Sequence, residues 1–325
     1  MTGPPPLPLH LHCTLRAHSG PIHVARLNSF GRYLLTGGAD RQIHLFNASS
    51  ASSSGPPIKT YNSHNGTVQA LDISPDNARF LSGGEDRNVY LYDVAKGLVL
   101  RRFSAHHGAI NALAFAGEQG AALVAAAGFD TTLRFYDLRA QGAWRPIMEC
   151  KEAKDAILCM AIRDANVWTG SVDGVVRTYD LRKGELREDT IDRPITSLTP
   201  STTQTTLLVS CLAREGGGDG EQATHSLLDL SDGTHLQTIQ GGPNRQYRCR
   251  STLWSSDSTV IAGDETGCVR AWDIVTGQER RVAGGDEHKE HAKATLWVEG
   301  TDKDGGKLVS AGADGVVKVW GVQPS

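Results

Sequence analysis

The feature that most constrains the fold of this chain is a short phrase that recurs along it. Each copy ends in a large apolar or aromatic residue followed by Asp, Asn or Gly, and successive ends lie 46, 44, 43, 49, 44 and 48 residues apart. The seven ends are Phe46-Asn47, Tyr92-Asp93, Tyr136-Asp137, Tyr179-Asp180, Leu228-Asp229, Trp272-Asp273 and Trp320-Gly321. A period of this length indicates repeated units that bury their apolar faces against one another.

The residues within each unit predict short β-strands. Runs such as VYLY, IHLF, LRFY and VKVW are rich in β-branched and aromatic residues and are bounded by Gly, Asp and Asn. Four short strands in a unit of about 44 residues, separated by turn signals, are typical of a propeller blade. Glycine is abundant, with 36 of 325 residues, and we expect pairs such as Gly83-Gly84 to permit tight turns. The sequence therefore predicts an all-β, seven-bladed propeller.

A set of polar residues repeats inside these units. Five units carry an Asp six residues before the aromatic end: Asp40, Asp86, Asp130, Asp173 and Asp314. A small residue precedes each Asp by four positions: Thr36, Ser82, Ala126, Thr169 and Ser310. His18, His64 and His106 lie 22, 22 and 24 residues before the Asp of their units. Because these side chains recur in several units, they indicate a structural framework rather than a catalytic triad, which needs only one site.

This pattern resembles the WD-repeat family over nearly the whole chain. The resemblance implies that the His, the Ser or Thr, the Asp and the aromatic residue of one blade form a buried hydrogen-bonded chain, with Trp272 and Trp320 as the tryptophans of two blades. Such a network stabilises a fold only if every member has a partner.

The two chain ends predict how the ring closes. The last unit stops at Trp320 without a fourth strand, whereas LHLHCTLRAH near the N-terminus matches the fourth strands that precede later units. We expect the N-terminal strand to complete the last blade. The predicted organisation is a flexible Pro-rich segment (1–8), one propeller (9–321) and a short tail (322–325).

Three units depart from the pattern, and we expect their blades to be less rigid. The fourth unit lacks the His, and the sixth has GGPNRQYRCR in place of the His motif and Thr266 at the Asp position. The fifth replaces its tight turn by REGGGDGEQ, residues 214–222. A flexible Ser-rich loop, residues 48–57, is predicted between the third and fourth strands of the first blade.

Composition argues against several classes of function. The net charge of −3 provides no basic surface for direct nucleic-acid binding. The six cysteines are far apart, form no C-x-x-C pair and follow no secretory signal, which fits a reducing compartment. No apolar stretch approaches about 18 residues, so no membrane span is predicted. We expect a cytoplasmic and nuclear protein that is monomeric within larger assemblies.

No catalytic residue, cofactor or metal site is predicted. HLHC at residues 10–13 places neighbouring side chains on opposite faces of a strand, and no second ligand pair follows at zinc spacing. His288 and His291 are expected in a solvated polar loop. The Gly-rich phrases do not open a helix, so they are not predicted to bind phosphate.

Partner proteins are expected to bind one face of the ring. In a WD-type propeller, the residues before each framework Asp and after each framework His lie around the channel on the same face. This interpretation selects Glu85, Phe129 and His107, and adds Arg245, Tyr247 and Arg248 from the sixth unit. Aromatic residues and Arg are enriched in binding hot spots.

The fourth unit, EAKDAILCMAIRDANVWTGSVDGVVRTYDLRKGEL, together with RPITSLTP and the sixth unit, looks like the mitogen-activated protein kinase organizer family. That resemblance implies a non-enzymatic scaffold in the spliceosome, in a kinase cascade, or in both. An alternative is a substrate receptor of a cullin-type ubiquitin ligase. YDLR occurs twice and resembles the W-D-x-R box of such receptors, with Arg139 and Arg182 as the contact residues.

Overall fold

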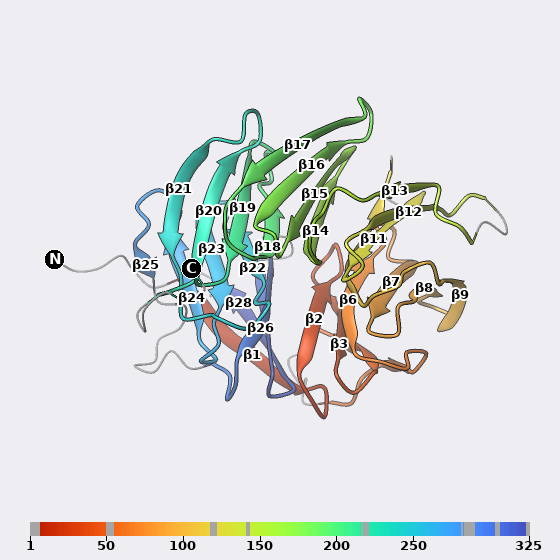
Figure 1. The fold of residues 1–325 in the computed structure, drawn as a ribbon. Helices are drawn as coiled ribbons and strands as arrows, with labels where there is room; N and C mark the ends of the chain where they lie inside the picture. Colours follow the sequence, from red (N-terminus) through yellow and green to blue (C-terminus); the bar gives the residue numbers. More distant parts are fainter. Residues whose placement is uncertain are drawn as a thin grey trace.

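The computed structural model describes residues 7–49, 55–117, 122–140, 144–214, 216, 221–280, 282, 290–302 and 306–322. Seven four-stranded antiparallel sheets are arranged as blades around a central channel (Figure 1). This confirms the predicted all-β, seven-bladed propeller. The described part of the chain contains no helix with the length and hydropathy needed to cross a membrane.

Each blade starts with its innermost strand. Blade 1 consists of β2 (Ile22–Leu27), β3 (Tyr33–Gly38), β4 (Ile43–Asn47) and β5 (Lys59–Tyr61). Blade 2 consists of β6 (Val68–Ile73), β7 (Arg79–Gly84), β8 (Val89–Asp93) and β9 (Leu98–Phe103). Blade 3 consists of β10 (Ile110–Ala116), β11 (Leu123–Gly128), β12 (Leu133–Asp137) and β13 (Met148–Cys150). Blade 4 consists of β14 (Ile157–Arg163), β15 (Asn166–Ser171), β16 (Val175–Asp180) and β17 (Glu185–Thr190).

The remaining blades follow the same order, except that the last draws its outer strand from the start of the chain. Blade 5 consists of β18 (Ile195–Pro200), β19 (Thr206–Cys211), β20 (Thr224–Asp229) and β21 (His235–Gln240). Blade 6 consists of β22 (Ser251–Trp254), β23 (Thr259–Gly263), β24 (Val269–Asp273) and β25 (Glu279–Arg280). Blade 7 consists of β26 (Thr295–Thr301), β27 (Lys307–Gly312), β28 (Val316–Val322) and β1 (Leu9–Arg16).

The N-terminal strand closes the ring as predicted. β1 pairs antiparallel with β28 from Leu9 opposite Val322 to Arg16 opposite Val316. The packing extends past the expected bounds of 9 and 321. Leu7 is buried in the same apolar cluster as Leu9, and β28 continues to Val322. Residues 1–6 and 323–325 lie outside the described residues, as do residues 50–54 of the Ser-rich loop, which does connect β4 to β5.

Glycines in the repeated phrase have a role that differs from the expected one. Gly83 and Gly84 end β7 and have no left-handed backbone conformation. A Cβ on Gly83 would lie 2.8 Å from the Cγ2 of Ile110 in the next blade, and one on Gly84 would lie 2.0 Å from the carbonyl oxygen of Thr67. Both glycines therefore allow close approach, between blades and to the preceding loop, instead of permitting a turn.

Candidate functional site

The predicted polar framework forms in blades 1, 2 and 7. In blade 1, His18 Nδ1 lies 2.8 Å from Asp40 Oδ1, and its Nε2 lies 2.8 Å from Thr36 Oγ1. In blade 2 the corresponding distances are 3.0 Å from His64 to Asp86 and 2.6 Å from His64 to Ser82. Both nitrogens of each imidazole thus have partners, as a buried polar network requires.

The framework carboxylates remain charged because their hydrogen bonds outweigh burial. Burial alone would raise the pKa of Asp40, but His18 and the backbone N–H groups of Gln42 and Ser19 donate to the carboxylate and lower its pKa. These hydrogen bonds have a structural role, since every one of these donors to the Asp40 carboxylate belongs to the fold itself.

Blade 7 contains a framework histidine that the sequence interpretation missed. His291 was expected in a solvated loop, but its side chain is buried, with Nε2 2.9 Å from Ser310 Oγ and Nδ1 3.2 Å from Asp314 Oδ1. Trp320 Nε1 also donates to Ser310 Oγ at 3.2 Å. The prediction for His291 was therefore wrong, although it lies 23 residues before Asp314, within the spacing of the other blades. His288 lies outside the described residues.

Blades 3, 4 and 6 use an arginine on the third strand instead of the complete framework. In blade 4, Thr169 is buried, and Asp173 pairs with Arg177, whose Nη2 lies 2.9 Å away and whose Nε donates to Glu188 Oε1 at 2.8 Å. In blade 3, Arg134 donates to Asp130 and Glu149, and its Nη1 lies 2.9 Å from His106 Nδ1.

Blade 6 shows the same arrangement with a shifted carboxylate. Thr266 does occupy the expected Asp position, but Asp264 takes over and accepts from Arg270 Nε at 2.9 Å. The use of an arginine in blades 3, 4 and 6 could have been predicted from the sequence, because LRFYD, VRTYD and VRAWD all carry Arg two residues before the aromatic end. Trp272 is buried in this blade, and its ring lies 5.0 Å from that of His225 in blade 5.

The face on which inner strands begin carries exposed side chains at several predicted contact positions. Phe129 follows β11 and is 57% exposed, and Tyr247 precedes β22 and is 41% exposed. Glu85, His107 and Arg245 are also exposed. We call this surface, defined by these five residues, the loop face.

Two of these residues also make local contacts. The Glu85 carboxylate accepts from the Oγ1 of Thr67 at 2.6 Å, and the backbone N–H of Arg245 donates to Glu265 at 3.0 Å. Phe129 and Tyr247 leave large apolar surfaces exposed, so they are the stronger candidates for partner contact.

Arg248 was predicted as a contact on this surface, but its side chain turns into the channel. Its guanidinium extends across the channel and donates to three backbone carbonyl oxygens: Asn111 at 2.9 Å, Leu158 at 3.1 Å and Gln69 at 3.0 Å. Burial lowers its pKa to about 10. Arg248 is therefore a strut that joins blade 6 to blades 2, 3 and 4. The prediction that Arg248 is a surface contact was wrong.

A β-bulge explains why these three carbonyl groups face the channel. In six blades the pairing of the inner strand skips its second residue, and in blades 2, 3 and 4 the skipped residues are Gln69, Asn111 and Leu158. A bulged residue is left out of the ladder, so its carbonyl group needs another partner. Blade 6 pairs without this shift. The segment before β22 is irregular, and from it the Arg248 guanidinium reaches these three carbonyl groups and donates to them.

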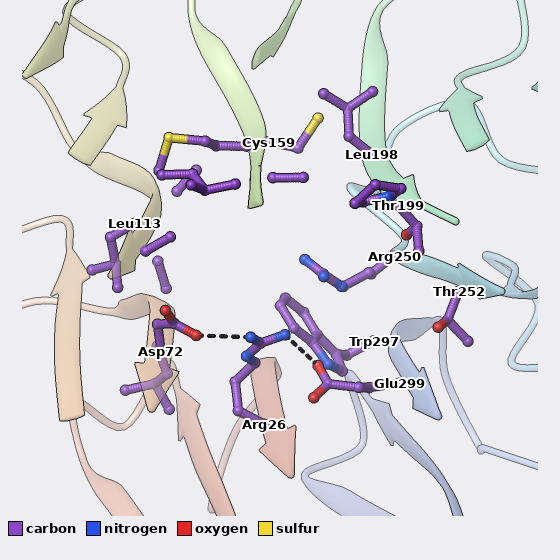
Figure 2. Close-up of a pocket in the computed structure, with 18 of the residues that line it drawn as sticks. Arg26, Asp72, Leu113, Cys159, Leu198, Thr199, Arg250, Thr252, Trp297 and Glu299 are labelled. Atoms are coloured by element: carbon purple, nitrogen blue, oxygen red, sulfur yellow. Dashed lines mark hydrogen bonds and ion pairs between the residues drawn. The ribbon is translucent and has the colours of Figure 1, made fainter. Parts of the chain in front are cut away.

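Arg26 is a second arginine that projects into the channel (Figure 2). Its Nη2 lies 2.7 Å from Asp72 Oδ1 and its Nη1 lies 2.8 Å from Glu299 Oε2, so one cation joins blades 1, 2 and 7. Burial opposes the charged form, but the Glu299 and Asp72 carboxylates outweigh burial and raise the pKa of Arg26.

One group in the described part of the chain could in principle ligate a metal ion. Ligand atoms of His18, Asp40 and His44 lie within 4.8 Å of one another. Both nitrogens of His18 already bond Asp40 and Thr36, and His44 Nδ1 lies 2.9 Å from Thr60 Oγ1. The geometry is explained by framework hydrogen bonds.

The two arginines proposed for a ligase adaptor both lie in turns after third strands. Arg139 is exposed and its Nη2 lies 2.9 Å from Asp137 Oδ2, within its own turn. The backbone N–H of Arg182 donates to Asp180 at 2.9 Å.

Comparison with known proteins matches the repeat unit. The family WD40 (WD domain, G-beta repeat) matches residues 10–47, 55–93 and 97–137. An uncharacterized WD repeat-containing protein of Schizosaccharomyces pombe is 36% identical over 132 residues, which is 41% of each chain. The WD repeat domain-containing protein 83 homolog of Dictyostelium discoideum is 25% identical over 337 residues, 94% of this chain and 96% of that protein. The U5 small nuclear ribonucleoprotein 40 kDa protein of Dictyostelium discoideum is 25% identical over 171 residues, 53% of this chain and 46% of that protein.

The similarity therefore covers about two fifths of the fission-yeast relative and nearly all of one Dictyostelium relative. The matching family is one of repeats that build interaction surfaces and does not indicate a catalytic activity. The matched repeats cover the first three units, and the seven four-stranded blades form a β-propeller with His–Ser/Thr–Asp networks. This chain is therefore a β-propeller that carries WD40 repeats and is similar to WD-repeat proteins.

Proposed function

We propose that this protein is a non-enzymatic scaffold that binds partner proteins through the loop face and acts in pre-mRNA splicing as a component of the spliceosome. The observation that carries the proposal is the exposure of Phe129 and Tyr247, at 57% and 41%, on a rigid ring. Two aromatic side chains held by turns between buried strands are suited to anchor a partner at low entropic cost.

Splicing is favoured over other cellular roles by two similarities. One relative is named as a U5 small nuclear ribonucleoprotein protein, and the fourth unit resembles a scaffold family described in the spliceosome. We further propose that the protein occurs in the nucleus and the cytoplasm and contacts protein rather than nucleic acid, in line with its net charge of −3.

Two alternative functions can be tested in the same experiment. The kinase-cascade role follows from the same scaffold resemblance. The ligase-receptor role depends on the two YDLR turns and is tested by Arg139→Ala combined with Arg182→Ala, which should abolish co-purification of a ligase adaptor if that role applies.

The test is affinity purification of the tagged chain from nuclear and cytoplasmic extracts, with mass spectrometry of the bound proteins. Phe129→Ala combined with Tyr247→Ala should reduce recovery of splicing proteins at least about 30-fold, since the loss of even one hot-spot aromatic costs about 2 kcal/mol. The matched control is Phe30→Ala, because Phe30 is 60% exposed in the turn after β2, at the opposite end of the blades.

Recovery of splicing proteins by the wild type and by Phe30→Ala, but not by the double variant, supports the proposal. Equal recovery by the double variant would rule out the loop face. Recovery of kinase-cascade proteins or a ligase adaptor without splicing proteins would replace the splicing role.

A further inference from the structure

The central channel contains a pocket of about 350 Å³ that is lined by residues of the inner strands. The Arg248 strut crosses it near the starts of β6, β10 and β14. The lining continues to Thr202, an exposed residue beyond the end of β18. The pocket therefore communicates with solvent on the face opposite the loop face, where inner strands end.

Arg250 projects into this pocket without an anionic partner (Figure 2). Its guanidinium carbon lies 4.5 Å from the centre of the Trp297 ring. Among the described residues, no carboxylate lies within ion-pairing distance of Arg250, and no acceptor hydrogen-bonds its guanidinium. Arg26 and Arg248 differ in this respect, because the first has two carboxylates and the second has three carbonyl groups.

The charges deep in the pocket leave one positive charge uncompensated. Three arginines, Arg26, Arg248 and Arg250, face two carboxylates, Asp72 and Glu299, which are both bound to Arg26. Burial, together with repulsion from Arg26, lowers the pKa of Arg250 to about 10, so the guanidinium is still charged at neutral pH. Arg250 is partly buried, and a cation that has lost part of its hydration without a hydrogen-bonded anion gains from an incoming one.

We propose that this pocket binds the carboxylate of an acidic side chain from a partner protein, with Arg250 as the residue that receives it. The site lies on the opposite face from Phe129 and does not depend on the loop face. A carboxylate carries one negative charge, which matches the single excess positive charge. A doubly charged phosphate group would also meet the Asp72 and Glu299 carboxylates, so it fits less well.

The walls of the pocket suit the apolar part of a glutamate side chain and its neighbours. Leu113, Cys159 and Leu198 surround the space in front of Arg250. A second cavity of about 530 Å³ adjoins the first and shares Phe115 and Arg163 with it. Its lining includes Ile73, Leu123 and Leu181, which favour a peptide in which aliphatic residues flank the acidic one.

The test uses three short peptides as probes: acetyl-Leu-Glu-Leu-amide, the same peptide with Gln, and the same peptide with phosphoserine. Each is titrated to about 10 mM, enough to detect a Kd near 1 mM. Binding is followed by isothermal titration calorimetry and by NMR of the arginine side-chain Nε–H signals. The Arg250 signal is assigned as the one that is absent from the spectrum of Arg250→Gln. The control variant is Arg145→Gln, which changes an exposed arginine before β13.

The Glu peptide should shift the Arg250 signal and bind at least about tenfold more tightly than the Gln peptide, because a charge-assisted pair is lost in the latter. Arg250→Gln should weaken binding of the Glu peptide by a similar factor, and Arg145→Gln should leave it unchanged. Because Arg250 has no structural acceptor, Arg250→Gln should fold normally, which circular dichroism and the melting temperature report.

Three outcomes would overturn the proposal. The first is equal binding of the Glu and Gln peptides, or no binding of either at about 10 mM. The second is unaltered binding by folded Arg250→Gln. The third is tighter binding of the phosphoserine peptide, which would assign the pocket to a phosphate group instead.

Discussion

Replacing Arg26 by Met should loosen the junction of three blades. The substitution retains most of the side-chain length but leaves the Asp72 and Glu299 carboxylates in the channel, with side chains only 12% and 14% exposed. Removing one partner of a buried ion pair costs about 3–5 kcal/mol. Since the Arg26 side chain is itself 27% exposed, we expect the lower end of that range, about 3 kcal/mol.

The assay is thermal and urea unfolding at pH 7. A loss of about 3 kcal/mol corresponds to a fall in melting temperature of roughly 5–10 °C for a domain of this size. Without Arg26, the two carboxylates remain in the channel without the cation that bonds both of them, so the loss should appear in the melting temperature and in the urea midpoint alike.

Arg250→Met is the matched control, because it removes a channel arginine that has no carboxylate partner. Its stability should change by less than about 1 kcal/mol or increase. Adding Asp72→Asn and Glu299→Gln to Arg26→Met should restore part of the lost stability. Equal losses in Arg26→Met and Arg250→Met would refute the assignment of Arg26 as a charge-paired junction.

Three further predictions concern the ring and its histidines. Deleting residues 1–16 removes β1 and several buried leucines, each contributing about 1.5–3 kcal/mol, so the melting temperature should fall sharply in calorimetry; unchanged cooperative unfolding would contradict the closure. Burial lowers the pKa of His225 to about 4, so it protonates mainly in the unfolded chain between pH 6.5 and 4. Wild-type stability should fall through that window by up to about 3 kcal/mol, and His225→Gln should flatten the fall in urea midpoints. His291→Ala should cost about 1–3 kcal/mol by removing the imidazole that bonds both Ser310 and Asp314, whereas His235→Ala, at an exposed position, should leave the urea midpoint unchanged.

Much of the fold could be predicted from the sequence because its information is local and repeated. The aromatic ends gave the number of blades, and the unmatched strand at residues 9–16 indicated the closure. His18, His64 and their partners also followed from spacing alone. His291 could have been found in the same way, but the polar residues around it were interpreted as a solvated loop.

The channel could not be predicted, since its contacts depend on the closed ring. Arg248 reaches carbonyl groups of three blades that are distant in sequence, and those groups are free only because each inner strand has a bulge. A bulge has no signature in these apolar strands. For the same reason, the unpaired state of Arg250 becomes visible only when the charges around it are counted in three dimensions.

The pairing of β1 with β28 also has a consequence for the order of folding. Blades 1 to 6 each form from strands that are consecutive in the chain, so they can assemble as synthesis proceeds. Blade 7 must wait, because Leu9 meets Val322 only after the intervening blades exist. Until then β1 and the edge that will receive it are both unpaired and open to pairing with another chain. The pairing of β1 with β28 is therefore the folding step at which a nascent chain is most open to domain swapping. A chaperone would have its largest effect at this step.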